Sequence, residues 1–455
     1  MAAGRKFLRT ILSYPPKTRS IGSFLKLQLT SIRCLSSNFL VKYSKSSQRF
    51  SSNQQNVYDV AIIGGGAIGS SSAYFLASKM QGQGKICVIE CDPTYSKAST
   101  TLSVASIRQQ FSMAENIQMS QYGFQFLSEI EQYLAVDGCD PPDVQLHCQG
   151  YLFLASKEGE ERMKENHATQ RELGCEVILL SPSELSERFP WLNTDGISLA
   201  SLGTGREGWF DPWSLLNAYK RKAISLNVDY ITGEAVDFVT DQNGQICSIK
   251  VVTSSSSNDP QTIHCRFMVN AAGAKAGYLA RKLGIYLPVE PRKRCVFVLS
   301  CPGAPNKHQM PLVVDTTGCY IRPESGSYLS GMSPPEEEDI ETSDFEVDYD
   351  FFYETMWPKL AHRIPLFECI KVQSAWAGHY EYNTLDQNCI IGRHPQIRNL
   401  IFVNGFSGHG IQQSPAAGRA VSELIMDGGF QTIDLSALGY ERVLNNESIK
   451  EKNIV

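Results

Sequence analysis

Residues 57–90 read VYDVAIIGGGAIGSSSAYFLASKMQGQGKICVIE, and this stretch decides the fold. The apolar, largely β-branched run at 60–63 is typical of a short strand that is buried on both faces. Small residues at 70–80 favour a helix, and 85–89 has the composition of a second buried strand. The stretch therefore predicts a strand–helix–strand unit with a parallel pair of strands.

The turn between the first strand and the helix carries a phosphate-binding pattern. Gly64, Gly66 and Gly69 have the G-x-G-x-x-G spacing, which allows a sharp turn, close approach to a pyrophosphate and tight helix–strand packing. Glu90 ends the second strand, 21 residues after Gly69. A carboxylate there can accept hydrogen bonds from both ribose hydroxyls of an adenosine. Together these residues predict a dinucleotide-binding site, with the positive end of the helix facing the phosphates.

Length and composition describe a globular protein of two or three domains. The chain has 455 residues, 42% of them hydrophobic and 20% charged. No apolar run approaches the roughly 18 residues that a membrane-spanning helix needs, so we expect no transmembrane segment, while peripheral membrane contact stays open. The 13 cysteines show no C-x-x-C spacing and no pairing with histidine. We therefore expect no metal site.

The charge of the chain is unevenly distributed. Residues 1–57 contain ten Lys or Arg, eleven Ser and no acid, which leaves 32 basic and 47 acidic side chains, or −15, for the remainder. An acid-free leader rich in Arg and Ser is typical of a mitochondrial (or plastid) transit peptide, and a disordered basic tail is the alternative. We expect 1–56 to be a transit peptide that is cut after Leu35 and directs the protein to the mitochondrial matrix, with inner-membrane association left open. The acidic remainder argues against nucleic acid as a partner.

The rest of the chain alternates strand–helix–strand and meander patterns, which predicts an α/β fold with an α+β second domain. We expect a Rossmann-like dinucleotide-binding domain built from discontinuous segments, beside a substrate or cap domain with an antiparallel β-sheet. The first domain is assigned to 57–106, 196–290 and 373–443, the second to 107–195 and 291–372, and a C-terminal tail to 444–455. Helices are predicted at 114–134, from Ser181 to about 189, at 213–226, 349–360 and 414–426.

Three polar segments remain ambiguous from the residues alone. The hydroxyls of the loop 92–106 are suited to bonding a pyrophosphate or a ring, but Ser and Thr are also ordinary loop residues. Lys293 and Arg294 precede an apolar run and belong either to a solvated strand edge or to a site wall. The run PPEEED at 334–339 is predicted to be a solvated acidic loop.

Three motifs in order carry a family resemblance: GGGAIG at 64–69, NAAG at 270–273 and GFSGHG at 405–410. With Glu90 they resemble the D-amino-acid-oxidase-like flavoprotein superfamily, which includes sarcosine oxidase, glycine oxidase and dimethylglycine dehydrogenase. The alternative for GFSGHG alone is a glycine turn that caps a helix. The resemblance implies FAD as the cofactor, held by Gly64, Gly66, Ala67, Ile68, Gly69, Glu90, Ser99, Thr100, Val236, Ala272, Gly273, Gly405, Phe406, Ser407, Gly408, His409, Gly410 and Ile411.

The same superfamily oxidises amines by hydride transfer to the flavin, and the resemblance implies four residues on the substrate side. Arg108 matches the carboxylate-binding arginine of the sarcosine oxidase branch, although an arginine in a polar loop is often a surface ion pair. Gln412 stands where sarcosine oxidases have a second cation, and Tyr380 where glycine oxidases have an arginine, which weakens the expected carboxylate site. His379 replaces the cysteine that tethers the flavin in sarcosine oxidases, so we expect noncovalent FAD. His379 is then either a site-wall or a catalytic residue, and Tyr320 is expected to line the substrate side.

Further stretches, among them STTLSVASIRQQF, EGWFDPWSLL and VQSAWAGHYEYNTLDQN, resemble a mitochondrial group of this superfamily that acts in assembling respiratory complex I. That resemblance implies complex I subunits or assembly intermediates as partners. Two functions therefore stay open. The weakened carboxylate site favours an assembly factor that contains FAD. The alternative, which Arg108 and the flavin-binding motifs support, is an amine oxidase or dehydrogenase acting on a small amine or N-methyl amino acid. An NAD-dependent dehydrogenase without flavin is a third, which leaves GFSGHG unexplained.

Overall fold

The stretch 57–90 folds into the expected strand–helix–strand unit in the computed structural model, which describes residues 57–253, 259–303, 305 and 310–452. The unit consists of β1 (Val57–Ile63), α2 (Ala67–Lys79) and β2 (Ile86–Glu90), and the two strands pair in parallel. The helix begins three residues before the predicted start because Gly66 already serves as its N-cap. The predicted leader, 1–56, lies outside the described residues.

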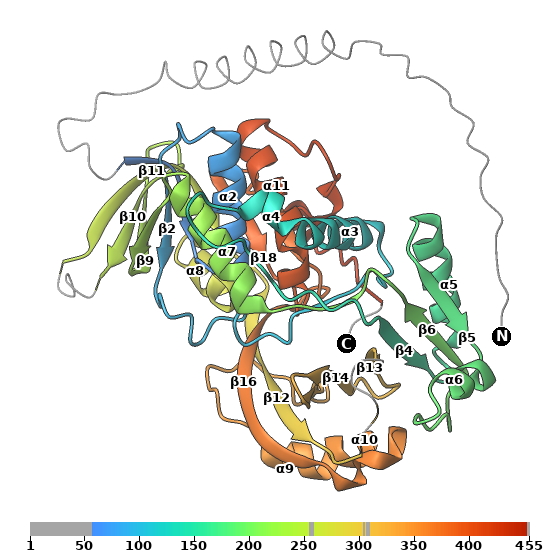
Figure 1. The fold of residues 1–455 in the computed structure, drawn as a ribbon. Coiled ribbons are helices and arrows are strands. Elements are labelled where there is room, and N and C mark those ends of the chain that lie inside the picture. Colours follow the sequence, from blue (N-terminus) through green and yellow to red (C-terminus); the bar gives the residue numbers. More distant parts are fainter. Residues whose placement is uncertain (1–56, 254–258, 304, 306–309, 453–455) are drawn as a thin grey trace, which may run out of the picture. The chain divides into compact units, whose positions relative to one another are not determined.

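A sheet of eight strands contains this unit (Figure 1), and its main path runs β17-β18-β11-β1-β2-β8. β11 lies between β1 and β18 and pairs with both of them in parallel. β10 pairs antiparallel with β11, and β9 pairs antiparallel with β10. Strands from distant parts of the chain thus share one sheet, which confirms a Rossmann-like domain built from discontinuous segments. The added strands are β8 (Asp229–Thr232), β9 (Glu234–Thr240), β10 (Ile246–Val252), β11 (Gln261–Asn270), β17 (Ile390–Arg393) and β18 (Leu400–Asn404).

Alternate residues of β1 serve two different cores, as the period of a strand requires. Val60 and Ile62 pack in the core that α2, α7 (Pro212–Ser225) and α11 (Gly410–Met426) share. Ala61 and Ile63 pack on the other face with β10 and α8 (Ala276–Arg281). Because this part of the central strand is covered on both sides, its buried residues 60–63 are all apolar.

The helix α11 starts at Gly410, four residues before the predicted start at Ser414. Pro415 lies inside the helix, where it cannot donate to the carbonyl of Ile411. The Ser414 hydroxyl donates to that carbonyl instead, at 2.9 Å. The helix therefore continues through the proline and begins directly after the second glycine-rich turn.

The second sheet also has eight strands, in the order β16-β12-β15-β14-β13-β4-β6-β5. All neighbours pair antiparallel except β13 and β4, which pair in parallel, so the predicted antiparallel sheet has one parallel junction. The strands are β4 (Tyr151–Ala155), β5 (Val177–Leu180), β6 (Leu199–Gly203), β12 (Val289–Ser300), β13 (Leu312–Val314), β14 (Tyr320–Glu324), β15 (Ser327–Gly331) and β16 (Lys371–Asn383).

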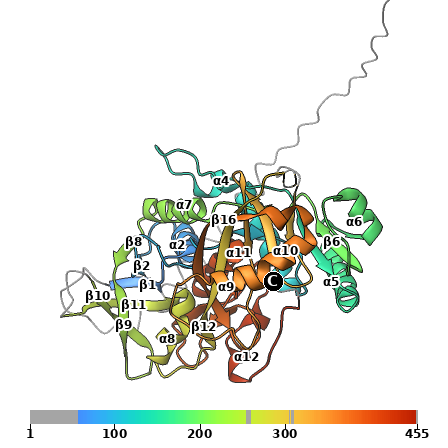
Figure 2. The ribbon, with the colours of Figure 1, turned by 90° about the horizontal axis from the view of Figure 1, so that it is seen from below.

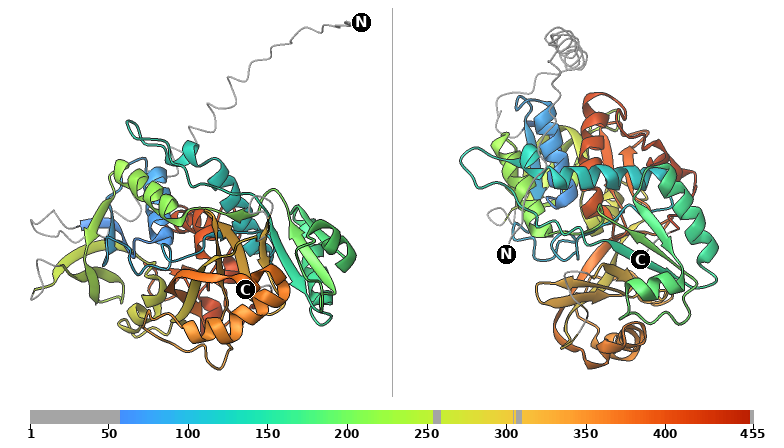
Figure 3. Two further views of the ribbon diagram at one scale, coloured as in Figure 1. Left: turned by 60° about the horizontal axis from the view of Figure 1, so that its bottom comes forward. Right: turned by 45° about the vertical axis from the view of Figure 1, so that its right-hand side comes forward.

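Helices cover this second sheet at two places (Figures 2 and 3). α9 (Tyr349–Phe351), a π-helical turn (Phe352–Met356) and α10 (Trp357–Arg363) occupy the predicted helix and pack on β12 through Phe352 and Phe297. α5 (Glu160–Glu172) and α6 (Pro182–Arg188) lie by β5, and Ser181 with Glu184 forms the capping box that starts α6. The predicted helix 114–134 is instead two, α3 (Ala114–Ser128) and α4 (Ile130–Leu134), because Glu129 leaves helical geometry.

Sheet membership differs from the predicted segments at two strands. β6 falls within 196–290 and most of β16 within 373–443, yet both belong to the second sheet, because each completes pairing with strands of that sheet. The described residues all fall in one compact unit, so the domain boundaries themselves stay predictions. The predicted C-terminal tail packs against the body: Glu451 is buried and accepts hydrogen bonds from the Ser112 amide at 2.7 Å and from Asn116 at 2.9 Å. In the described part of the chain, no helix has the length and apolar character to span a membrane.

Candidate functional site

The first glycine-rich turn joins β1 to α2 and leaves no room for larger residues. Gly64 has φ +98°, and a Cβ there would collide with the carbonyl oxygen of Ala271. A Cβ at Gly69 would collide with the carbonyl oxygen of Gly64. Only glycine therefore permits the turn and the close approach of α2 to the sheet.

Glu90 closes this turn from the end of β2. Its Oε2 atom accepts a hydrogen bond from the Gly65 amide at 2.7 Å, and Oε1 accepts from the Asp92 amide at 2.8 Å. The hydroxyl of Tyr95 lies beside Gly65, is buried, and has no hydrogen-bond partner among the described residues. The nucleotide end thus offers a carboxylate and an unsatisfied hydroxyl, the groups that bind ribose and phosphate oxygens.

Ser99 and Thr100 connect this end to the second sheet. Thr100 Oγ1 accepts from the Ala67 amide at the start of α2, at 3.0 Å. Ser99 Oγ donates to the carbonyl oxygen of His379 on β16, at 2.6 Å. The two predicted cofactor residues therefore lie between the glycine turn and the pocket described below.

The remaining predicted nucleotide residues lie on neighbouring strands. Val236 is half-buried on β9, which begins directly after Gly233, whose amide donates to the Glu90 carbonyl at 2.9 Å. Ala272 and Gly273 directly follow β11, and Gly273 (φ +57°) has no heavy atom within 4 Å of where its Cβ would lie. Ile68 is buried in the first turn of α2.

The second glycine-rich turn, 405–410, joins β18 to α11. Three of its residues have positive φ: Gly405 at +74°, Ser407 at +48° and Gly408 at +97°. Glu381 on β16 holds the turn from beneath, because its Oε2 atom accepts from the Gly405 amide at 3.3 Å and its carbonyl from the Ser407 amide at 3.1 Å. We expected the amides of this turn to face a flavin, and these two instead face Glu381. Burial raises the pKa of Glu381 to about 8, only partly opposed by the amides of Gly405 and Phe406.

The two turns lie at the same edge of the first sheet. β1 and β18 both run parallel to β11, so their carboxyl ends, which lead into the two turns, meet at one edge. The helices that follow pack tightly: a Cβ at Gly418 would collide with Ser71, and Ser71 Oγ donates to the Ser414 carbonyl at 2.7 Å. Both helix N-termini therefore open toward the same region.

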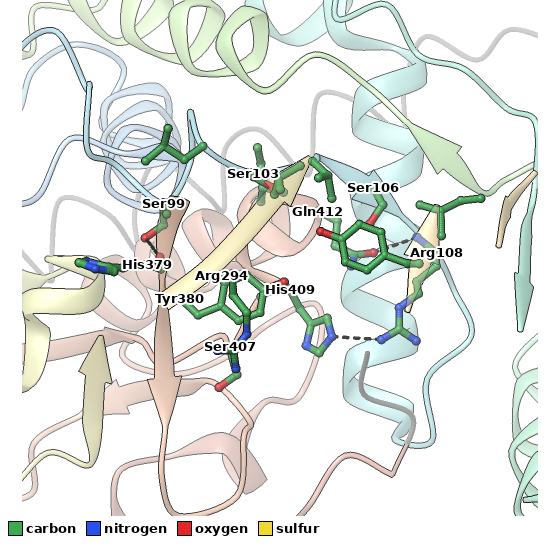
Figure 4. A pocket seen from close by; sticks show the side chains of 18 of the residues that line it. Ser99, Ser103, Ser106, Arg108, Arg294, His379, Tyr380, Ser407, His409 and Gln412 are labelled. Carbon is green, nitrogen blue, oxygen red and sulfur yellow. Dashed lines mark hydrogen bonds between the residues drawn. The ribbon is translucent and has the colours of Figure 1, made fainter. Parts of the chain in front are cut away.

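A pocket extends from the second turn to the second sheet (Figure 4). Polar groups converge on it from the segment 99–108, from β4, β12, β14 and β16, from the second turn and from α11. It is lined by Ser99, Leu102, Ser103, Val104, Ser106, Arg108, Tyr151, Arg294, Val296, Leu312, Tyr320, Gly378, His379, Tyr380, Ser407, Gly408, His409, Ile411 and Gln412.

Arg108 is a buried pocket residue and not a surface ion pair. Its side chain is 1% exposed, and its guanidinium lies over the Phe111 ring at 4.2 Å. One terminal nitrogen donates to the Gln110 carbonyl at 2.5 Å, and the other lies 3.0 Å from Nε2 of His409. Burial lowers the pKa of His409 well below its ordinary value, and the charge of Arg108 lowers it further. The pocket thus pairs a buried cation with a neutral imidazole.

The other three predicted substrate-side residues, Gln412, His379 and Tyr320, line the same pocket but have different contacts. Gln412 accepts from the backbone amide of Arg108 at 2.9 Å, so it positions the arginine in place of a second cation. The His379 ring is tilted against the Phe345 ring, with the ring centroids 4.1 Å apart, and Nε2 of His379 lies 2.7 Å from the Asp344 carbonyl oxygen, which agrees with a site-wall residue. The Tyr320 residue as a whole is only half-buried. Its hydroxyl is nevertheless shielded from water, and this burial raises its pKa well above 10.

Tyr380, which stands where glycine oxidases have an arginine, also lines the pocket. Arg294 lines it too, which settles the ambiguity of that residue in favour of a site wall. Sequence reasoning missed a further group, Glu207. Glu207, buried nearby, accepts from the Gln109 amide at 2.5 Å and from Gln110 Nε2 at 2.7 Å, and burial raises its pKa to about 7. The acid lies in a loop about 100 residues from its partners, so no local pattern marks it. Among the described residues no group of three or more His, Cys, Asp or Glu could hold a metal.

Comparison with known proteins identifies clear relatives. A family model described as FAD dependent oxidoreductase matches residues 59–424. The FAD-dependent oxidoreductase domain-containing protein 1 of Xenopus laevis is 48% identical over 423 residues, covering 87% of this chain and 85% of the relative. The Drosophila melanogaster homolog is 38% identical over 427 residues, covering 87% and 81%. Glycine oxidase of Bacillus subtilis is 26% identical over 381 residues, covering 81% and 93%.

Solved structures share the fold. L-proline dehydrogenase from P. horikoshii superposes with a TM-score of 0.75 at 24% identity, covering 87% of this chain and 100% of that one. Glycine oxidase from Geobacillus kaustophilus gives a TM-score of 0.70 at 24% identity, covering 85% and 98%. At such identities the likeness shows the fold alone.

The residues present fit FAD, the cofactor of the matched family. The first turn leaves only backbone where a pyrophosphate would lie, since side chains at Gly64 and Gly69 are excluded. The buried Tyr95 hydroxyl, which has no partner among the described residues, is available to the nucleotide end of FAD. The second turn lies at the same sheet edge and is available to the ring end.

Proposed function

Because this chain belongs to the family of FAD-dependent oxidoreductases, we propose that it oxidises a small amine or N-methyl amino acid at the carbon next to nitrogen. The observation that carries the proposal is the pocket, which joins the second glycine-rich turn to the buried guanidinium of Arg108. The name glycine oxidase, borne by a sequence relative, supports an amino acid as the substrate class.

The two turns would hold opposite ends of the cofactor. The backbone of 64–69, Glu90 and Thr100 would take the pyrophosphate and ribose, and 407–411 would meet the ring end. When bound, FAD supplies the two-electron acceptor for a hydride from the substrate carbon. No residue in the described pocket offers a tethering cysteine, and His379 is engaged with Asp344 and Phe345, which supports noncovalent binding.

The protein's own residues would bind the amine in its neutral form and keep water out. Arg108 provides positive charge for an anionic group, and its charge also disfavours a protonated amine nearby. His409 is neutral and hydrogen-bonded to Arg108, so it fixes the guanidinium without adding charge. The rings of Tyr151, Tyr320 and Tyr380 supply the apolar walls.

Anaerobic mixing tests this proposal. The FAD-loaded protein is mixed with a panel of glycine, N-methylglycine, proline and N,N-dimethylglycine while the flavin absorption is recorded. We expect at least one amino acid to bleach the oxidised flavin band, and the Arg108→Gln variant to require a higher concentration. If none reduces the flavin while dithionite does, the amine-oxidising function is rejected.

We also propose that the protein acts in mitochondria as a factor for assembling respiratory complex I, with subunits or assembly intermediates as partners. The acid-free basic leader and the resemblance of long stretches to a mitochondrial group support this second function. Cell fractionation and the amount of complex I after depletion of the protein test it. Rescue by wild type but not by a variant lacking FAD would tie the role to the flavin, and unchanged complex I would reject it.

A further inference from the structure

Arg294 brings a second guanidinium to the pocket from β12. The strand register places Arg294 opposite Gly378 on β16, and the guanidinium lies over the Tyr380 ring at 5.0 Å. Burial raises the pKa of the Tyr380 hydroxyl, and the charges of Arg294 and Arg108 both oppose that rise. Tyr380 therefore lies within reach of both cations, and the pocket has a positive group from each of two elements.

The fork of Arg294 holds a carboxylate of the protein itself. Nη1 donates to Oδ1 of Asp339 and Nη2 donates to Oδ2, each over 2.7 Å. The two side chains are only 10% and 11% exposed, so solvent screens the pair weakly. The Nε donor of Arg294 is buried and has no hydrogen-bond partner among the described residues. The geometry is the bidentate one by which arginine binds any carboxylate.

Asp339 ends the run 334–339, which is predicted from the sequence to be a solvated acidic loop and lies within the longer loop 332–348. Glu336, Glu337 and Glu338 are exposed as expected, whereas Asp339 turns inward because its amide donates to the Pro335 carbonyl at 3.0 Å.

The same loop is fastened beside the pocket at its far end. Asp344 pairs with Lys293 at 2.8 Å, and its carbonyl meets Nε2 of His379. The neighbouring Phe345 ring packs at a tilt against the ring of His379, which lines the pocket. The loop therefore borders the pocket along the Arg294 side.

We propose that Arg294 binds the substrate carboxylate together with the positive charge of Arg108, and that Asp339 occupies the Arg294 fork until that carboxylate takes its place. The inference rests on the proposed amine-oxidising function and names its substrate class, an amine that carries a carboxylate. Arg294 supplies from a neighbouring strand the cation that Tyr380 and Gln412 do not provide. While Asp339 occupies the fork, a substrate carboxylate cannot bind there. The apparent affinity of the pocket for the substrate therefore falls in proportion to the fraction of molecules whose fork is free.

Carboxylate binding without turnover tests this. The FAD-loaded protein is titrated with acetate and with succinate, with acetamide as the uncharged probe, and binding is read from the shift of the flavin absorption band. We expect Asp339→Asn to tighten binding of both carboxylates about tenfold, and Arg294→Gln to weaken it about tenfold or more. Glu337→Gln, the matched control in the same loop, should leave both dissociation constants unchanged.

The proposal is overturned if Asp339→Asn and Arg294→Gln both bind carboxylates as wild type does. It is also overturned if no variant binds a carboxylate at all, and in either case the ion pair is purely structural. If Asp339→Asn does not fold because it leaves a buried unpaired charge, the double variant Arg294→Gln with Asp339→Asn decides. It should bind carboxylates about tenfold more weakly than wild type, and equal affinity rejects the proposal. Because the readout needs no reduction of the flavin, failure of every amine to bleach it rejects the oxidoreductase function alone.

Discussion

The Nε2 atom of His409 lies 3.0 Å from a terminal nitrogen of Arg108, at the point where the second glycine-rich turn becomes α11. A guanidinium has donors only, so Nε2 must accept and the histidine must be neutral. Burial and the neighbouring charge, which lower the pKa of His409 well below 6.5, agree with that assignment. The pair thus gives the pocket one fixed positive charge near neutral pH.

We expect Arg108→Gln to raise the pKa of His409 only partway toward its ordinary value, because burial is the larger cause of the depression and remains. Histidine NMR signals followed over pH 4–8 measure this. His394, whose pKa is lowered by its own burial, is the internal control and should not move. A His409 that already titrates near 6.5 in wild type would contradict the neutral pair.

Alanine at Gly64 or Gly69 should abolish cofactor retention. Each added Cβ meets a backbone carbonyl oxygen, and Gly64 also has positive φ, so the turn must deform. We expect the FAD content per chain to fall below about a tenth of the wild-type value. Gly429→Ala, where no atom lies within 4 Å, is the matched control and should retain full FAD. Normal FAD content in Gly64→Ala would contradict the phosphate-turn assignment.

Glu90→Gln should weaken FAD binding about tenfold, because an amide replaces a carboxylate that accepts from two backbone amides and faces the expected ribose. Equilibrium dialysis of FAD gives the dissociation constant. Exposed Glu187, on α6, provides the control Glu187→Gln, which should bind FAD as wild type does. Equal affinity in both variants would remove Glu90 from the nucleotide site.

The buried carboxyl of Glu381 should make stability fall with rising pH. Its folded pKa of about 8 exceeds the ordinary 4.5, so the fold retains a proton that the unfolded chain has lost. This contribution is fully present below about pH 4.5 and is lost as pH rises through about 8. Glu381→Gln should flatten the decline in the free energy of unfolding between pH 5 and 9, measured by chemical denaturation.

Part of that decline will remain in Glu381→Gln, because Glu207, with its pKa raised to about 7, contributes in the same direction. The control Glu187→Gln should keep the full slope. A wild-type protein whose stability rises over this range would contradict both assignments.

The first turn was predictable because its pattern is local. The spacing of Gly64, Gly66 and Gly69, with Glu90 at the next strand end, is read within one strand–helix–strand unit, and the structure differs there only in the helix start. The same holds for the capping box at Ser181. Such features depend on neighbours that are close in sequence.

Other features depend on pairings that no local pattern encodes. The short strands β5, β6 and β17 were missed because each has at most five residues and gains its stability from partners far along the chain. Asp339 and Arg294 meet across 45 residues, and Glu381 reaches Gly405 across 24. The second turn was predicted less completely, since Glu381 accepts from one of its amides through the side chain and from another through the backbone carbonyl.

The central claim is that two distant turns of one chain hold the ends of a single FAD without a covalent bond. The absorption spectrum of the purified protein, recorded before and after acid precipitation, tests it most directly. We expect a yellow protein with about one flavin per chain, all of it released as FAD into the supernatant. A colourless protein, or flavin that stays with the precipitate, would contradict it.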